Sequence, residues 1–164
     1  MKSILVPKKY LPKGITKKDR QKQSKILMKS RNLYKKGEYY TRKKIPSFRT
    51  KKSHFIDEAK KMYKVSKIGA TNELAKSTKC TKSSLKKIIQ KGEGAYYSSG
   101  SRPNQTAQSW GIARLASAIT SGKAAAVDYS ILEKGCAHGS KALRLAKIAK
   151  NKKTRKVSKV SILK

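Results

Sequence analysis

The chain has 164 residues and a formal net charge of +35, from 43 Lys and Arg against eight Asp and Glu. This length allows one modest domain, and with 37% hydrophobic and 7% aromatic residues a folded core can extend over only part of the chain. No apolar run approaches the roughly 18 residues of a transmembrane helix, and the apolar patch that follows Met1 is too short for a signal peptide.

The charge is unevenly distributed. Residues 1–91 contain 29 basic and five acidic side chains, and residues 134–164 contain 11 basic side chains and none that is acidic, whereas residues 92–133 contain three of each. Together with the helical signals that follow, this pattern predicts a mainly α fold: a small helical module with extended, Lys-rich N- and C-terminal arms. The expected parts are a basic N-terminal arm with one amphipathic helix (1–52), a small helical domain (53–150) and a basic C-terminal tail (151–164).

The N-terminal part combines lysines with few apolar residues. Residues 1–15 contain prolines and glycine and are predicted as an extended arm. Thr16 and Asp19 have the spacing of a capping box, and they predict a helix that Gly37 ends. Its apolar stripe is narrow, so we expect it to need a partner surface. Residues 37–52 are predicted as a loop or irregular linker.

Helical patterns then follow one another as far as Gly92. Ser53 is a candidate cap for a helix over residues 54–65, and Thr71 is a candidate cap for a short turn. A further helix is predicted over residues 82–91, with Gly92 as its end.

The region after Gly92 is rich in glycine and serine, and residues 92–105 are predicted as a structured loop or short hairpin. Thr106 begins the clearest helix, over residues 107–121. Asp128 is a candidate cap for one more turn, and Ser140 for the last helix. Convincing β alternation is absent from the sequence, apart from short pieces near Tyr96-Tyr97 and Val157–Leu163. The predicted core consists of large apolar residues from two neighbouring helices: Leu85, Ile89, Trp110, Leu115 and Ile119.

No constellation of residues predicts catalysis, a metal or a cofactor. His54 and His138 are far apart, and a zinc site needs about four ligands. The glycines lack the lysine and hydroxyl of a phosphate-binding loop. We therefore expect that the protein is not an enzyme. The two cysteines, Cys80 and Cys136, do not make a disulfide scaffold; we favour free thiols, and a bond between them is the alternative.

The excess of lysine over arginine favours nonspecific contact with phosphates, because Lys is a point charge whereas Arg is a bidentate fork. A solvated surface normally mixes both signs of charge, which these segments barely do. An anionic membrane surface is another partner that such charge suits. The residues expected to bind nucleic acid or a partner are Lys8, Lys9, Lys17, Lys18, Arg42, Lys43, Lys44, Arg49, Lys51, Lys52, Arg102, Lys152, Lys153, Arg155 and Lys156.

The segment from Ser101 to Thr106 has two interpretations. In the first, it is an entry into the next helix, and Arg102 and Trp110 are structural anchors. In the second, it is a recognition edge, where Arg102 reaches a carboxylate or phosphate beside exposed Tyr96 and Tyr97. The sequence leaves both open.

Several stretches resemble an uncharacterised domain of large double-stranded DNA viruses of algae and protists, and of some phages: Ile68–Lys76, Lys91–Trp110, Ala113–Ile119 and Val127-Asp128. The resemblance covers roughly residues 68–140, and its most distinctive motif is Gly-Ser-Arg-Pro-Asn-Gln-Thr at residues 100–106. The domain has no known function, but it implies a viral setting in which a Lys-rich protein is a virion component.

Two functions follow as hypotheses. The first is a structural virion protein: a minor capsid or internal capsid protein whose basic arms bridge other capsid proteins and packaged DNA. It would lie in the virion interior or on the capsid inner face, and in the host cytoplasm or nucleus during assembly. The alternative is a soluble, histone-like protein that binds and compacts nucleic acid.

Overall fold

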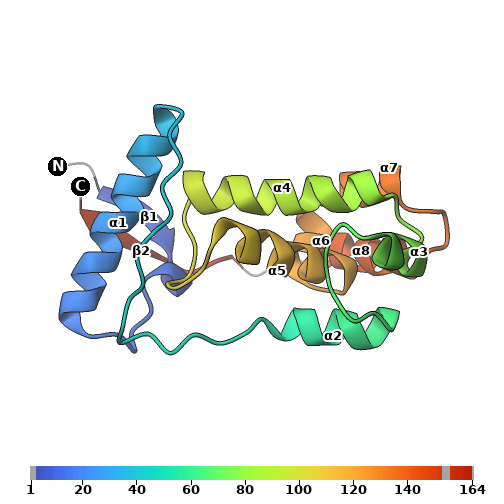
Figure 1. Ribbon diagram of the computed structural model, residues 1–164, viewed down its shortest axis with the longest axis horizontal. Helices are drawn as coiled ribbons and strands as arrows, with labels where there is room; N and C mark the ends of the chain where they lie inside the picture. Colours follow the sequence, from blue (N-terminus) through green and yellow to red (C-terminus); the bar gives the residue numbers. More distant parts are fainter. Residues whose placement is uncertain (1–2, 153–155, 164) are drawn as a thin grey trace. The chain divides into compact units, whose positions relative to one another are not determined.

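The computed structural model describes residues 3–152 and 156–163 (Figure 1). Within these residues the chain forms eight α-helices and one pair of strands, which confirms the prediction of a mainly α fold. The elements in chain order are β1 (Ser3–Pro7), a 3₁₀ turn (Lys8–Tyr10), α1 (Lys17–Lys35), α2 (His54–Tyr63), α3 (Asn72–Thr78), α4 (Lys82–Ser98), α5 (Ala107–Ile119), α6 (Lys123–Val127), α7 (Tyr129–Gly135), α8 (Lys141–Asn151) and β2 (Lys159–Leu163).

The described residues pack as two compact units. Unit 1 combines the chain up to Lys51 with Gly94–Ala107 and the residues from 156 onward, and unit 2 combines Lys52–Glu93 with residues 108–152. Helix α4 is shared, because its last turn belongs to unit 1. The N-terminal segment and the end of the tail, both predicted as arms, are therefore parts of a folded unit.

The N-terminal residues form a strand instead of the predicted extended arm. β1 and β2 pair antiparallel, with Val6 opposite Val160 and Ile4 opposite Ile162. Val6 and Ile162 are buried, as expected when alternate residues of two strands face the same core. The predicted β character of the C-terminal end is confirmed. Its partner could not be found from local pattern, because it lies at the opposite end of the chain.

Helix α1 begins at the predicted cap, but the capping box is only half formed. The backbone N–H of Asp19 donates to Thr16 Oγ1 at 3.2 Å. The Asp19 carboxylate does not bond back to Thr16; it accepts hydrogen bonds from the Ser47 hydroxyl and backbone N–H, at 2.5 and 2.9 Å. These bonds hold the pKa of the Asp19 carboxyl below its ordinary value. The carboxylate thus ties α1 to the loop of residues 37–51.

The inner face of α1 is covered by other parts of unit 1. Gln23, Leu27 and Ser30 lie at i, i+4 and i+7 and are buried, and Gln23 Nε2 donates to Tyr10 O at 3.1 Å. Gly100, with a φ of +117°, passes so close that a Cβ there would lie 2.8 Å from Leu27 Cδ2. The partner surface that the narrow stripe requires is therefore supplied by the same chain.

Helix α4 is longer than predicted. Gly92 does not end it, and the first half of the predicted 92–105 loop is helical up to Ser98. The reason is a close helix crossing: a Cβ added at Gly92 would lie 2.6 Å from Gly111 Cα on α5. Glycine is needed here for close packing and not as a helix stop, and the cost of glycine inside a helix is only about 1 kcal/mol.

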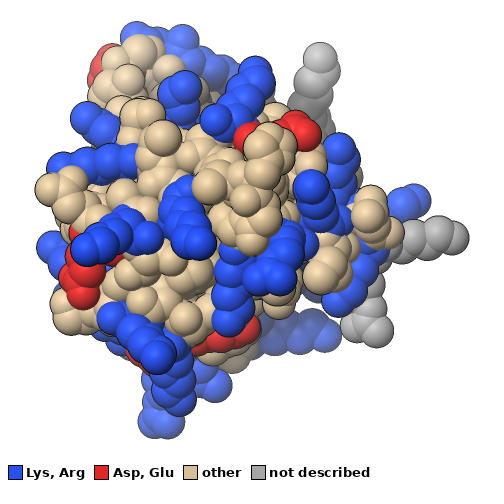
Figure 2. All heavy atoms as spheres, turned by 90° about the vertical axis from the view of Figure 1, so that its right-hand side faces the viewer, with Lys and Arg blue, Asp and Glu red and all other residues tan. Residues whose placement is uncertain are grey.

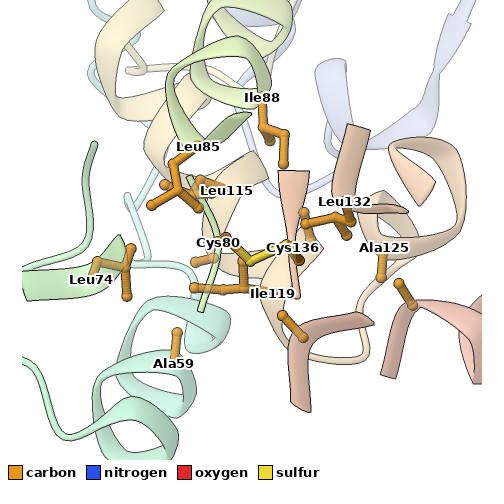
Figure 3. Packing of buried hydrophobic residues seen from close by; sticks show 14 of the residues in the cluster. Ala59, Leu74, Cys80, Leu85, Ile88, Leu115, Ile119, Ala125, Leu132 and Cys136 are labelled. Atoms are coloured by element: carbon orange, nitrogen blue, oxygen red, sulfur yellow. A yellow bond between two sulfur atoms is a disulfide. The ribbon is translucent and has the colours of Figure 1, made fainter. Parts of the chain in front are cut away.

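The core of unit 2 forms where α2, α3, α4, α5 and α6–α8 meet (Figure 3). Of the predicted core residues, Leu85, Leu115 and Ile119 are fully buried, and Ile89 is partly buried and packs against the cluster. Tyr63 joins them by donating its hydroxyl to Ile119 O. Burial raises the pKa of the Tyr63 phenol above its ordinary value.

Trp110 was also predicted to be a core residue, and this prediction is wrong. Its side chain is half-buried and lies outside the core cluster. The buried stripe of α5 runs through Gly111, Leu115 and Ala118, spaced by four and three residues. Trp110 precedes Gly111 by one position, a rotation of about 100° around the helix, so it lies beside the buried stripe and not within it.

Cys80 and Cys136 form a disulfide, so the favoured interpretation as free thiols is wrong. Figure 3 shows the bond among the core side chains. The two residues also make an isolated antiparallel bridge, in which Thr81 N donates to Gly135 O at 2.8 Å and Ala137 N to Lys79 O at 2.9 Å. The bond therefore joins the α3–α4 connection to the α7–α8 connection, at a separation of 56 residues.

Candidate nucleic-acid interface

Most of the predicted binding residues are exposed. These are Lys8, Lys9, Lys17, Lys18, Lys43, Lys44, Arg49, Lys51, Lys52, Arg102, Lys152 and Lys156. Lys153 and Arg155 lie outside the described residues. The strand pair brings the two termini together, because Lys8 N donates to Ser158 O at 2.8 Å. One predicted site residue, Arg42, is not accessible to a ligand.

The outer face of α1 carries a stripe of lysines, of which only Lys18 was predicted as a binding residue. Lys18, Lys22, Lys25 and Lys29 are all exposed and lie at i, i+4, i+7 and i+11. This spacing places them within one narrow arc of the helix, opposite the buried Gln23–Leu27 side. The stripe runs for roughly 16 Å at 1.5 Å per residue. The sequence does contain the sign of this stripe, because these lysines recur every three or four residues, the spacing that is usually looked for in apolar residues.

The loop of residues 37–51 lies beside this stripe. Lys22 Nζ donates to Lys44 O at 3.3 Å, and Lys29 Nζ lies 4.7 Å from the centroid of the Tyr40 ring. The loop lysines Lys43 and Lys44 are exposed. We call the six lysines of this surface the α1 basic face: Lys18, Lys22, Lys25, Lys29, Lys43 and Lys44.

The α1 basic face carries far more positive than negative charge. Among the described residues, no Asp or Glu forms an ion pair with its six lysines. Unit 1 has 23 Lys and Arg in its sequence and only two acidic residues, Asp19 and Glu38, and Asp19 is engaged by Ser47. The charge of Asp19 also acts on Lys22 and Lys18, and the remaining positive charge of this surface is balanced by ions from solution or by an anionic ligand.

Unit 2 is also basic but carries more acidic residues. Its sequence contains 20 Lys and Arg against six Asp and Glu. Figure 2 views the side on which α3 lies in Figure 1, and shows Lys and Arg spread widely with a few Asp and Glu between them. Because unit 2 is basic as well, an experiment that removes charge from the α1 basic face needs a control in which the same charge is removed from unit 2.

Arg42 is a positioning residue inside unit 1 and not the phosphate ligand that was predicted. Its guanidinium donates to Tyr96 O at 2.7 Å, Ser101 Oγ at 2.7 Å and Ser30 Oγ at 3.0 Å, and lies 3.7 Å from the centroid of the Tyr96 ring. Burial lowers the pKa of Arg42 from its ordinary value. Arg42 therefore binds the loop to α1 and to the end of α4, and holds Lys43 at the surface. The sequence gives no sign that Arg42 is buried, because it stands in a basic run beside the exposed Lys43 and Lys44.

Asn104 fixes the other end of the same loop. Its Oδ1 accepts from Ile45 N at 2.7 Å, and its Nδ2 donates to Ile45 O and Phe48 O, both at 3.2 Å. Ser101 and Asn104 thus brace the loop, whereas the first interpretation named Arg102 and Trp110 as the anchors. Tyr96, expected to be exposed in the second interpretation, is fully buried, while Arg102 is exposed.

Replacing Arg42 with methionine should lower the stability of unit 1 by about 2 kcal/mol, because charged hydrogen bonds of this kind contribute roughly 1.5–3 kcal/mol. Amide hydrogen exchange of α1 is the measurement, since the only tryptophan, Trp110, belongs to unit 2. Lys43→Met, at an exposed neighbour, is the control and should leave the exchange unchanged. Equal α1 protection in the two variants would contradict the positioning role.

The described residues show no other site with evident chemistry. None of them forms a group of three or more His, Cys, Asp or Glu side chains able to hold a metal ion. No helix within residues 3–152 is both long and apolar enough to cross a membrane. An open hollow of about 560 Å³ lies along α4, lined in part by Lys82, Lys86 and Glu93.

The sequence model of one protein family, described as a family of unknown function (DUF5824), matches residues 7–144. The chain belongs to this family. The matched region includes the α1 basic face, Arg42 and both cysteines. No curated protein and no solved structure matches the chain. The family description names no activity, so the function has to be argued from the surface itself.

Proposed function

We propose that this protein binds nucleic acid through its phosphates, without sequence preference, and that the α1 basic face is the principal contact. The observation that carries the proposal is the row of four lysines on one side of α1, extended by Lys43 and Lys44, none of which forms a salt bridge with a described acidic residue. Phosphates that replace the counterions of such a row release them into solution, which favours binding. Lysine ammonium groups suit this contact because they do not require a particular base or geometry.

A virion is the setting that we propose for this binding. The resemblance to a domain of large double-stranded DNA viruses supports it, and a structural protein on the capsid inner face would meet packaged DNA and other capsid proteins. Free arms are not needed for such a role. Leu5 is 60% exposed and offers an apolar contact to a capsid subunit. In this proposal the protein has no catalytic activity.

The second candidate, a soluble protein that compacts nucleic acid, is favoured by the spread of Lys and Arg over unit 2 as well (Figure 2). Fractionation of particles separates the two. A virion structural protein should remain with empty shells at fixed stoichiometry after nuclease and high salt. Release together with the DNA would support the compacting role instead.

Removing the charge of the α1 stripe should weaken binding and its salt dependence. The variant replaces Lys18, Lys22, Lys25 and Lys29 with glutamine, which keeps helix propensity. Each lost phosphate contact lowers the slope of log K against log salt by about 0.9, so the slope should fall by about 3–4. Anisotropy titrations of a random-sequence duplex at several salt concentrations measure this slope.

The matched control replaces four exposed unit 2 lysines with glutamine: Lys61, Lys67, Lys76 and Lys147. Net charge falls equally in both variants, so a general loss of charge would affect them equally. The proposal predicts a clearly larger change of slope for the α1 variant. If the two variants show the same slope, the α1 basic face is not the principal contact; if the wild type shows no salt dependence, phosphate binding itself is wrong.

A further inference from the structure

Unit 1 carries a chain of tyrosine rings that the proposed phosphate contact does not use. The centroids of Tyr34 and Tyr39 lie 6.1 Å apart at an interplanar angle of 65°, and those of Tyr39 and Tyr97 lie 5.0 Å apart at 66°. Tyr39 is 71% exposed and Tyr34 is 36% exposed. We call these three residues the tyrosine platform. A tyrosine that only fills a core would be mostly buried. The exposed surface of Tyr39 therefore needs another explanation.

The platform rests on a rigid base. Tyr97 contacts Tyr96 at a centroid distance of 5.0 Å, and Tyr96 is fully buried under the Arg42 guanidinium. The Tyr96 hydroxyl also accepts a hydrogen bond from Arg42 N at 3.0 Å. Rings held in this way lose little conformational entropy when a ligand stacks on them. The buried pair of Arg42 and Tyr96 therefore prepares the exposed rings for binding.

The platform lies on the side of α1 that carries Leu27, seven residues before Tyr34, and Tyr40 links it to the α1 basic face. Tyr40 follows Tyr39 in the chain, and its ring lies under Lys29 Nζ at 4.7 Å. Lys35 and Lys36, at the end of α1 that carries Tyr34, are exposed. Exposed aromatic rings beside a positively charged surface are the arrangement on which single-stranded nucleic acids bind, with bases on the rings and phosphates on the lysines. A duplex keeps its bases stacked on one another and offers none to Tyr39.

We propose that unpaired bases stack on the tyrosine platform. The protein should then bind single-stranded nucleic acid more tightly than a sugar–phosphate chain of the same charge that has no bases. This inference rests on the proposed phosphate binding, because the α1 basic face holds the backbone of the same strand. The charge of unit 1 favours this occupant over an apolar protein segment, which would leave the neighbouring lysines without a counter-charge. Base identity matters little, since every base presents a ring face.

An oligonucleotide without bases tests stacking separately from charge. The probes are fluorescently labelled (dT)₁₂ and a chain of the same length made entirely of abasic sites. Wild-type protein should bind (dT)₁₂ about 10-fold more tightly than the abasic chain, from the usual strength of base–aromatic stacking. Tyr39→Ala should reduce this ratio to near one without changing affinity for the abasic chain or a duplex. Tyr39→Phe, which keeps the ring, should restore the ratio.

The possible outcomes are distinguishable. Equal affinity of the wild type for (dT)₁₂ and the abasic chain overturns base stacking and leaves the proposed phosphate binding intact. A Tyr39→Ala variant that also loses duplex affinity overturns stacking, because Tyr39 would then act through the fold of unit 1. Failure of the wild type to bind any probe overturns both proposals. Hydrogen exchange of α1 confirms that each variant is folded.

Discussion

Asp128→Asn is expected to destabilise unit 2 by about 3–5 kcal/mol, the usual cost of breaking a buried ion pair from one side. The Asp128 side chain is completely buried. Its carboxylate accepts two hydrogen bonds from Arg114, at 2.8 and 2.9 Å, and lies 3.0 Å from Lys91 Nζ. Asparagine keeps the shape but removes the charge, so the Arg114 guanidinium, whose side chain is only 22% exposed, loses both of its hydrogen bonds to a carboxylate.

The position of Asp128 makes this loss global within unit 2. Asp128 ends α6 and begins α7, while Arg114 and Lys91 belong to α5 and α4. One carboxylate thus holds four helices together. Urea denaturation followed by Trp110 fluorescence measures the effect, because the only tryptophan of the chain lies in this unit.

Asp57→Asn is the matched control. Asp57 also bonds a lysine, with Lys52 Nζ at 3.0 Å, but the two side chains are 59% and 56% exposed. Exposed pairs contribute about 0–1 kcal/mol, so Asp57→Asn should shift the denaturation midpoint only slightly. Equal shifts for the two variants would show that Asp128 is not the buried link that we describe.

Loss of the disulfide should cost unit 2 about 4 kcal/mol. The Cys80–Cys136 bond closes a loop with a sequence separation of 56, and restricting the unfolded chain over a loop of this length stabilises the native state by about that amount. The variant replaces both cysteines with alanine, and urea denaturation followed by Trp110 fluorescence again reports unfolding. Adding a reductant should destabilise the wild type and leave the double variant unchanged.

Thiol titration provides an independent check. Protein purified without reductant and then unfolded should show no free thiol, because the chain contains only these two cysteines. Two reactive thiols per chain would contradict the bond and restore the interpretation that the sequence favoured.

Local signals in the sequence were sufficient to predict most of the helix starts. Thr71 and Ser140 cap α3 and α8 as predicted, by accepting hydrogen bonds from Leu74 N and Leu143 N. Ser53 stands at the start of α2 without a side-chain cap bond. Asp128 stands at the start of α7 in the same way, since its carboxylate is taken by Arg114. A capping hydrogen bond can be predicted because its donor and acceptor lie within one turn of each other. It does not form when a cation from a distant part of the chain, such as Arg114, binds the side chain that would cap the helix.

Glycine shows the limit of local reasoning most clearly. Gly92 was predicted to end a helix, yet α4 continues through it to Ser98. The sequence does not show that α5 approaches Gly92 through Gly111. The five residues of α6 were missed for a related reason: the sequence shows only a short run of alanines, and packing in unit 2 determines that they are helical.

For the site, the sequence identified the partner chemistry but only some of the residues. An excess of 35 positive charges has the same consequence in any fold, so a preference for polyanions could be predicted from composition alone. Which lysines share a surface depends on how loop 37–51 lies against α1, and this depends on Arg42 and Asn104. Arg42 looked like a phosphate ligand, because a sequence does not show which member of a basic run is buried.

The amino-acid sequence by itself determined the mainly helical class, most helix starts and the basic character of both ends, because these depend on residues within a few positions of one another. Tertiary structure alone decided the partners separated by long stretches of chain: β1 with β2, Cys80 with Cys136, and Tyr39 with Tyr97. Each of these contacts depends on the closure of a loop of more than 50 residues. The entropy of closing such a loop is overcome only when the whole core forms, so no local pattern records it.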